Sequence, residues 1–263
     1  MTFMKDREAD LQEAPVGTEA VEVDAFPPEA REAILALLVT LGDNKYKLGR
    51  RYSEWATAGP TLEASVAAAS MTSDEMGHAR SLYPLLRKFP GAPPELKRET
   101  DRTKFHSVSF LDRSFGRWTD FIAAAAIFDK AMSVLVEGLR DSSYAPFRHR
   151  AAKILQEEHY HALYADGWVE TLAREEGTRT ELKRSMNRIW TETLAWFGPD
   201  DDPVFRAAVA AKIVDAPGAE LRERFVKRVR RAVDPVASLG FPDDSTLPWD
   251  RWDATDRRLL DAS

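Results

Sequence analysis

Cysteine is absent from this chain of 263 residues. Its absence excludes disulfide bonds, iron–sulfur clusters, thiolate zinc sites and cysteine nucleophiles. Any metal ion must therefore be held by histidine and carboxylate side chains. The sequence offers five histidines and 43 acidic residues for that purpose.

Long apolar runs are also missing. The longest lies in the segment 121–128, far short of the roughly 20 residues that span a bilayer. The first ten residues, MTFMKDREAD, are charged and contain no apolar stretch of the kind found in signal peptides. We therefore expect a soluble, cytoplasmic protein with no membrane partner.

An excess of positive charge is lacking as well. The net charge is -6 and the isoelectric point is about 5.5, which opposes a general nucleic-acid-binding surface. Basic residues do cluster at 227–231. This cluster could recognise a local anion, but a solvated helix face is the simpler interpretation and the one we prefer.

Apolar residues recur at helical spacing between a few points rich in glycine and proline, which predicts an all-α chain. Two long antiparallel helical hairpins are expected, followed by shorter helices. The expected helices span roughly 28–55, 61–86, 113–139, 146–174, 180–197, 202–214 and 219–233. We divide the chain into an acidic, mobile arm (1–27), a helical domain (28–234) and an irregular tail (235–263) that wraps a surface.

The inward-facing stripe of each long helix is apolar except near its middle. On the first helix, Lys45 falls among Ile34, Leu38, Leu41, Leu48, Tyr52 and Trp55. A buried ammonium is costly unless it meets carboxylates, so Lys45 needs an acidic partner. Asp129 interrupts an almost wholly apolar third helix and needs a partner too. Asp43 should face outward, about 200° away from Lys45 around the helix.

The second and fourth helices each carry a Glu-x-x-His pair, Glu75 with His78 and Glu158 with His161. At this spacing a carboxylate and an imidazole project from one helix face. In an antiparallel hairpin, residues equidistant from the turn lie at the same height. Reflection about the two turns therefore places Glu75 opposite Lys45 and Glu158 opposite Asp129, so that all six side chains share one layer.

This layer matches five of the six positions of a carboxylate-bridged di-metal centre in a ferritin-like four-helix bundle. The predicted ligands are Glu75, His78, Asp129, Glu158 and His161. Oxygen and nitrogen donors of this kind suit one or two Fe(II) ions, with Mn(II) as an alternative. Glu157 could replace Glu158 as the partner of His161, although Glu158 would then be unexplained. A buried network of salt bridges without metal is the competing interpretation.

Several motifs resemble the bacterial phenylacetyl-CoA epoxidase family over roughly residues 30–175. The runs 41–44, 48–55 and 59–63 are similar to its structural subunit, as are 77–80, 128–129, 160–161 and 165–169. Asp74-Glu75-Met76-Gly77-His78 and Glu158 with His161 instead resemble its catalytic subunit. That resemblance implies a di-iron monooxygenase that epoxidises an aromatic acyl-CoA with O2.

Lys45 departs from this pattern, because it stands where the catalytic subunit has a glutamate ligand on its first helix. Three carboxylates and one ammonium leave a charge of about -2, which matches one divalent ion rather than two. Three interpretations stay open. Lys45 pairs with Glu75 beside a mononuclear or weakened centre, or it replaces the metal, or it is a neutral amine beside two metals.

Three functions follow from these alternatives. The first is an oxygenase subunit of a multicomponent complex, with an acyl-CoA substrate, a separate reductase and a substrate cavity lined by the third helix. The second is a non-catalytic structural subunit that pairs with a homologous ferritin-like subunit; a homo-oligomer is also possible. The third is a metal-dependent oxidase or storage protein on the same bundle. The fold alone does not choose among them.

Overall fold

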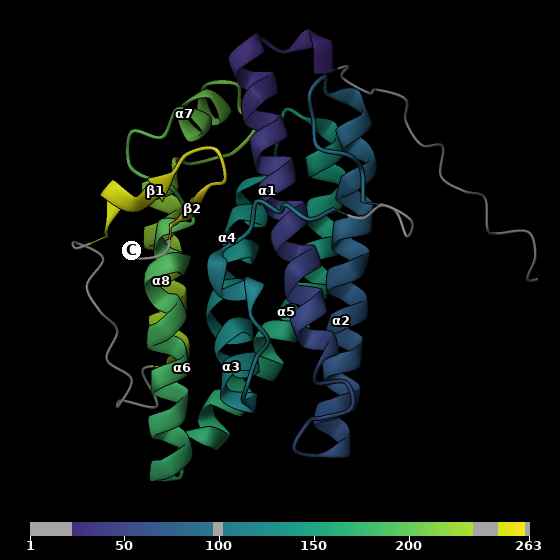
Figure 1. Ribbon diagram of the computed structural model, residues 1–263. Coiled ribbons are helices and arrows are strands. Elements are labelled where there is room, and N and C mark those ends of the chain that lie inside the picture. The colour runs from purple at the N-terminus through teal and green to yellow at the C-terminus, as the bar shows by residue number, and fades with distance from the viewer. Residues whose placement is uncertain (1–22, 97–101, 234–246, 261–263) are drawn as a thin grey trace, which may run out of the picture.

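The computed structural model describes residues 23–96, 102–233 and 247–260. Two long helical hairpins form its centre, as the sequence predicts, and the chain has the expected all-α, ferritin-like architecture (Figure 1). Helix α1 (Pro28–Ser53) packs along α2 (Leu62–Leu82). The second hairpin comprises α3 (Trp118–Ala123), a π-helical turn (Ala124–Asp129) and α4 (Lys130–Gly138), which return through α5 (Ala145–Leu172).

Local sequence signals fix the ends of the first hairpin. Proline at the first position begins α1, where its missing N–H costs nothing. Thr61 caps α2, because its hydroxyl accepts a hydrogen bond from the backbone N–H of Ala64 at 3.1 Å. The chain continues beyond α2 as a 3₁₀ helix, Tyr83–Lys88, where the sequence predicts α-helix up to residue 86.

The third predicted helix differs most from expectation. It begins at Trp118 rather than near residue 113, because Glu54 holds the preceding segment: its carboxylate accepts hydrogen bonds from Ser114 Oγ at 3.1 Å and from the Phe115 N–H at 3.2 Å. The π-helical turn that ends at Asp129 was not predicted. A π turn contains an extra residue, so it shifts the phase of the side chains around the helix where Asp129 enters the bundle.

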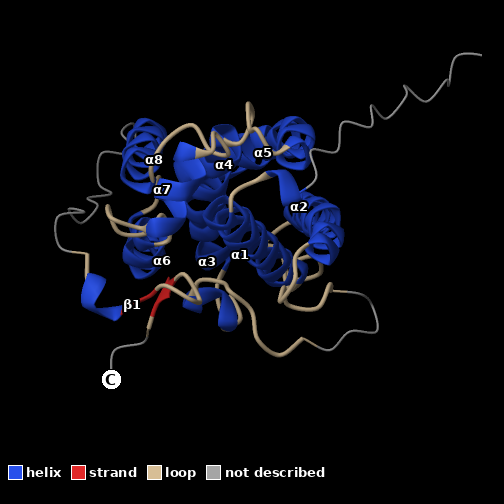
Figure 2. Cartoon of the chain, turned by 90° about the horizontal axis from the view of Figure 1, so that it is seen from above, coloured by secondary structure: helices blue, strands red, loops and turns tan. Residues whose placement is uncertain are grey.

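Shorter elements cover one side of the bundle, while α2 lies on the other (Figure 2). They are α6 (Glu176–Ala195), α7 (Pro203–Ala210) and α8 (Gly218–Val233). Helix α6 packs against α3, and α8 packs against α4 and α5. All three helices agree with the sequence-based positions to within a few residues.

The described part of the tail is more regular than the sequence predicts. After a 3₁₀ turn (Trp249–Arg251), strands β1 (Trp252–Asp253) and β2 (Arg258–Leu259) pair antiparallel, with Trp252 opposite Leu259. Asp253 Oδ1 accepts hydrogen bonds from the backbone N–H groups of Thr255 and Asp256 and so closes the turn. Residues 1–22 and 234–246 lie outside the described residues, and the division into arm, domain and tail stays a prediction.

Asp43 corrects another expectation. It does not face solvent but is fully buried under the connection that crosses α1. Arg102 contacts its two carboxylate oxygens at 2.9 and 2.8 Å, and the Tyr83 hydroxyl donates a hydrogen bond to it at 2.9 Å. Helical periodicity gave the correct direction, away from Lys45, but could not show that residues 102–108 cover this face.

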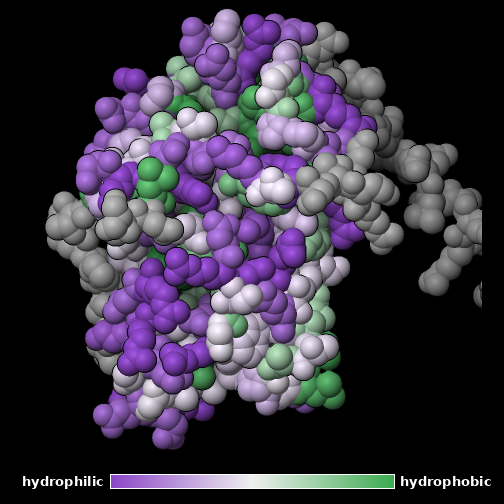
Figure 3. Space-filling model, in the orientation of Figure 1, coloured by the Kyte–Doolittle hydropathy of each residue, from purple (hydrophilic) through white to green (hydrophobic). Residues whose placement is uncertain are grey.

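The core consists of apolar and aromatic side chains from every major helix. One aromatic cluster lies near Lys45 along the bundle: Phe121 packs against Tyr52 and Trp118, with ring centroids 4.6 and 4.5 Å apart. The face drawn in Figure 3 is mostly hydrophilic, with small apolar patches. Among the described residues, none of the helices has the length and apolar character that crossing a bilayer requires.

Candidate metal centre

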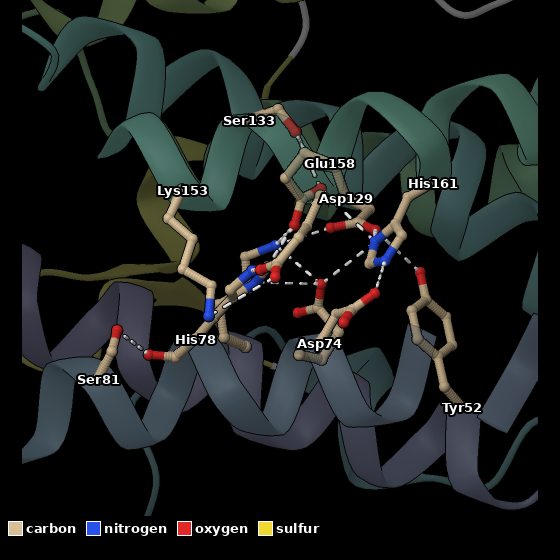
Figure 4. A network of polar contacts seen from close by, with 12 residues as sticks. Tyr52, Asp74, His78, Ser81, Asp129, Ser133, Lys153, Glu158 and His161 are labelled. Carbon is tan, nitrogen blue, oxygen red and sulfur yellow. Dashed lines mark hydrogen bonds and ion pairs between the residues drawn. The ribbon is translucent and has the colours of Figure 1, made fainter. Parts of the chain in front are cut away.

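Six polar side chains meet in the middle of the four-helix bundle (Figure 4). Helix α1 supplies Lys45, and the π-helical turn supplies Asp129. Helix α2 supplies Glu75 and His78, and α5 supplies Glu158 and His161. All six are buried. The structure thus brings together every residue that reflection about the hairpin turns placed in one layer, while their role as metal ligands stays a prediction.

The ammonium of Lys45 lies at the centre of this layer. Its Nζ atom donates to Glu75 Oε1 at 3.0 Å and to Asp129 Oδ1 at 2.9 Å. It also donates to Glu158 Oε1. One cation therefore contacts a carboxylate from each of the other three helical segments of the bundle. Each carboxylate reaches it with a single oxygen.

The two histidines are arranged alike, each with Nδ1 toward the layer and Nε2 away from it. His161 Nδ1 lies 3.1 Å from Asp129 Oδ2. His78 Nδ1 lies 3.4 Å from Glu158 Oε1. On the outer side, His78 Nε2 contacts Glu157 Oε2 at 2.7 Å. His161 Nε2 contacts Asp74 Oδ2 at 3.2 Å.

These outer contacts are crosswise. Asp74, which precedes Glu75 on α2, contacts His161 of α5. Glu157, which precedes Glu158 on α5, contacts His78 of α2. From the sequence, Glu157 is expected only as a substitute ligand beside His161, and Asp74 only as part of a family motif. The sequence signal that identifies both is an acidic residue directly before each Glu-x-x-His pair. Such carboxylates fix the orientation of a metal-binding imidazole.

Two hydroxyl groups complete the layer. Ser133 Oγ lies 3.1 Å from Glu158 Oε2 and 3.0 Å from the carbonyl oxygen of Asp129. Tyr52 donates a hydrogen bond to Asp129 Oδ2 at 3.4 Å. Neither hydroxyl is predicted from the sequence: Tyr52 lies on an apolar stripe, and a serine one turn after Asp129 carries no distinctive signal.

The electrostatics of the layer favour a charged Lys45. Burial lowers the pKa of Lys45, but the negative charges of Asp129, Glu158 and Glu75 outweigh burial and raise this pKa well above its ordinary value. A raised pKa is the opposite of what a neutral, metal-ligating amine requires. In the metal-free layer, Lys45 is therefore a charged ammonium.

Other groups respond to the same charges. Burial raises the pKa of Asp129, but the opposite effect of Lys45 and His161 is larger. The pKa of Asp129 therefore lies well below its usual range. Burial and the charge of Asp129 raise the pKa of Glu75 to about 7. Burial lowers the pKa of His161, but its hydrogen bond to Asp129 and the surrounding carboxylates raise it to about 10. Protons and Lys45 thus neutralise a cluster that a metal would otherwise neutralise.

The donor set fits a metal ion in its chemistry. Glu75, Asp129, Glu158 and His161 each offer one donor atom, and these atoms all lie within 4.8 Å of one another, so the group could bind a metal. His78 is not part of this compact group. Among the described residues, two buried atoms of the α2 pair, Glu75 Oε2 and His78 Nδ1, have no hydrogen-bond partner. Lys45 Nζ, however, contacts one oxygen of each of the three carboxylates in this group.

The remaining histidines lie outside the layer. His149 and His159 are exposed. His106 Nδ1 lies 3.0 Å from the carbonyl oxygen of Thr255 and so contacts the turn of the β-hairpin. All three agree with the surface or structural roles that the sequence favoured.

Comparison with known proteins identifies the family. The family of phenylacetic acid catabolic proteins matches residues 5–255. Two subunits of 1,2-phenylacetyl-CoA epoxidase from Escherichia coli strain K12 are also similar. The one designated C is 27% identical over 173 residues, which cover 64% of this chain and 69% of that protein. The one designated A is 28% identical over 192 residues, which cover 71% of this chain and 60% of that protein.

The second of these matches thus spans less than two thirds of the relative's own length. The two identities are nearly equal, so identity does not decide which of the two relatives this chain resembles in role. The family resemblance read from the motifs is confirmed. This chain belongs to the family of phenylacetic acid catabolic proteins.

Proposed function

We propose that this chain is a structural subunit of a multicomponent, phenylacetyl-CoA-epoxidase-like complex and acts in phenylacetate catabolism beside a homologous catalytic subunit. The observation that carries the proposal is the contact of Lys45 Nζ with Glu75, Asp129 and Glu158. A cation supplied by the chain itself occupies the middle of the carboxylate cluster. The cluster then stabilises the bundle instead of binding a redox metal.

Charge supports this role. The three carboxylates are balanced in part by Lys45, and the raised pKa of His161, about 10, keeps its imidazole protonated near neutral pH. Removing either cation would leave buried negative charge, which is strongly destabilising. A metal ion could bind His161 only by displacing this proton, and it would compete with Lys45 for the carboxylate oxygens. The arrangement therefore favours the protein without metal.

A second candidate is a metal-dependent oxygenase subunit, and a specific observation favours it. Both histidines turn Nδ1 toward the layer and are held at Nε2 by the outer carboxylates, Glu157 for His78 and Asp74 for His161. Glu75 Oε2 and His78 Nδ1 accept or donate no hydrogen bond within the described part of the chain, so both atoms are available as metal donors. The residues that would hold the metal are Glu75, His78, Asp129, Glu158 and His161. Iron, in one or two ions, or manganese would supply O2 activation when bound.

In that second role the chain's own residues have definite tasks. Lys45 must withdraw from the three carboxylates, since its ammonium competes with the metal for the same oxygens. Asp74 and Glu157 fix the tautomers of the two histidines, with the proton on Nε2. A separate reductase would deliver electrons, and an aromatic acyl-CoA would be the substrate. Buried aromatic residues such as Phe121 exclude water from one side of the layer.

The two roles are separated by reconstituting the complex from this chain, the catalytic subunit from the same source and a reductase, and measuring O2 consumption with phenylacetyl-CoA. We compare the parent with His161→Ala, and with His159→Ala as a matched control two residues away on the exposed side of α5. A structural subunit tolerates both substitutions once it has assembled. Loss of turnover in assembled His161→Ala complexes, with His159→Ala active, would establish the oxygenase role instead.

A further inference from the structure

An open pocket of about 930 Å³ lies between α4, α5 and α8, and Ser133 and Glu158 of the layer around Lys45 are among its lining residues. These three helices lie side by side along one edge of the molecule in Figure 2. Its volume falls in the range of roughly 300–1,000 Å³ that is typical of small-molecule sites. Six basic residues line it, although the whole chain has a net charge of -6: Lys130, Arg140, Arg224, Lys227, Arg228 and Arg231.

The acidic residues of the pocket are already paired. Asp166 contacts Lys130, and Glu137 contacts Arg228 at 2.5 Å. Glu158 belongs to the Lys45 cluster. In contrast, the side chains of Arg140, Lys227 and Arg231 have no ion pair or hydrogen bond with another residue of the described chain. Counted over the described residues, the pocket thus has three unbalanced positive charges and no unpaired carboxylate in its lining to balance them.

The basic residues of the pocket come from two walls. On α8, Arg224, Lys227, Arg228 and Arg231 follow the i, i+3, i+4, i+7 spacing of one helix face. Arg140 follows the end of α4 and belongs to the other wall. Lys227, Arg230 and Arg231 are exposed, as the interpretation of residues 227–231 as a solvated helix face predicts. Arg140 adds a basic residue from a second element to the same pocket.

We propose that this pocket is a binding site for a small anion that carries two or more phosphate groups. Arginine presents a planar fork of donors that matches phosphate oxygens, and lysine adds a mobile point charge. Three unbalanced cations on two walls suit a ligand with spread negative charge better than a single carboxylate or sulfate. The assignment is independent of Lys45 and of the role proposed for the complex.

The test is isothermal titration calorimetry of the full chain with inorganic pyrophosphate and, separately, with ADP. The parent should bind pyrophosphate saturably. Lys227→Ala/Arg231→Ala and Arg140→Ala should each weaken binding by about tenfold or more. Arg230→Ala is the matched control, because Arg230 is exposed on the same helix but does not line the pocket. Tighter binding of ADP than of pyrophosphate would assign a nucleotide-type ligand, and equal binding would assign the phosphates alone.

Three results would overturn the proposal. The first is the absence of saturable binding of either probe by the parent. The second is equal weakening by Arg230→Ala and by the double substitution, which would indicate general surface charge. The third is unchanged binding by Arg140→Ala, since the site would then lack its second wall. Because all of the substituted residues are exposed, thermal unfolding that matches the parent's checks that each variant is folded.

Discussion

The Nζ atom of Lys45 lies 2.9 Å from Oδ1 of Asp129, a carboxylate 84 residues further along the chain. The same ammonium contacts Glu75 and Glu158, so one side chain joins all the helical segments of the bundle's centre. A residue in this position has two consequences. It contributes to the stability of the fold, and it opposes a metal at the same place.

Replacing Lys45 with methionine should destabilise the protein by about 3–5 kcal/mol, because three buried carboxylates lose their cation. Urea unfolding measures the difference. Lys47→Met is the matched control two residues away, where the ammonium forms one ion pair with Asp112 near the surface at 2.8 Å. Its cost should stay within about 1 kcal/mol. Equal costs for the two substitutions would refute a central role for the Lys45 cluster.

Replacing Lys45 with glutamate should convert the layer into a metal site. The substitution removes the competing cation and supplies a carboxylate from the first helix at this layer. Lys45→Glu should therefore bind more Mn(II) or Fe(II) per chain than the parent. Equilibrium dialysis gives the stoichiometry, and added metal should raise the variant's midpoint of thermal unfolding. Unchanged or lower metal content would show that Lys45 does not stand at a ligand position.

In the Lys45→Glu background, Glu157→Gln should lower metal affinity by about 10–100-fold, because Glu157 orients His78 through Nε2. Asp74→Asn should act in the same direction through His161. Competition with a fluorescent chelator measures both constants. Glu170→Gln, a change of an exposed acid on the same helix as Glu157, serves as the control. An affinity equal to that of Lys45→Glu alone in both test variants would argue against orienting contacts.

Stability of the metal-free protein should fall at alkaline pH because of His161. Its pKa in the folded chain is raised to about 10, against about 6.5 when unfolded. The folded state therefore binds a proton that the unfolded state releases. The contribution is complete below pH of about 6.5 and is lost as pH rises toward 10, by an amount on the order of a few kcal/mol. His161→Asn should flatten the dependence of the unfolding free energy on pH over this window, whereas the exposed His159→Asn should leave it unchanged.

Much of the fold follows from the sequence, because periodicity and chain reflection are local rules. They placed Lys45 opposite Glu75, and Asp129 opposite Glu158, since two hairpins with short turns leave little freedom in register. The π-helical turn at Asp129 was not predicted, as it depends on how the almost wholly apolar segment packs against its neighbours. The burial of Asp43 depends on a connection whose path the sequence does not specify.

The site was predictable in its members but not in its contacts. Spacing on one helix shows that Glu158 and His161 share a face, yet it cannot show that Glu157 reaches across to His78. The charge state of Lys45 was also open, because it depends on three distances to atoms on other elements. The basic pocket needed the structure as well, since Arg140 and Arg231 come together only when α8 packs on α4 and α5.

The most direct test of the central claim is the iron and manganese content per chain, measured by elemental analysis on protein from metal-supplemented cells. His161→Ala and the complex with the catalytic subunit are analysed in parallel. If Lys45 replaces the metal, this chain should contain almost none in any sample, and the metal of the complex should belong to its partner. About one or two equivalents in the parent chain that disappear in His161→Ala would contradict the account and establish a metal centre here.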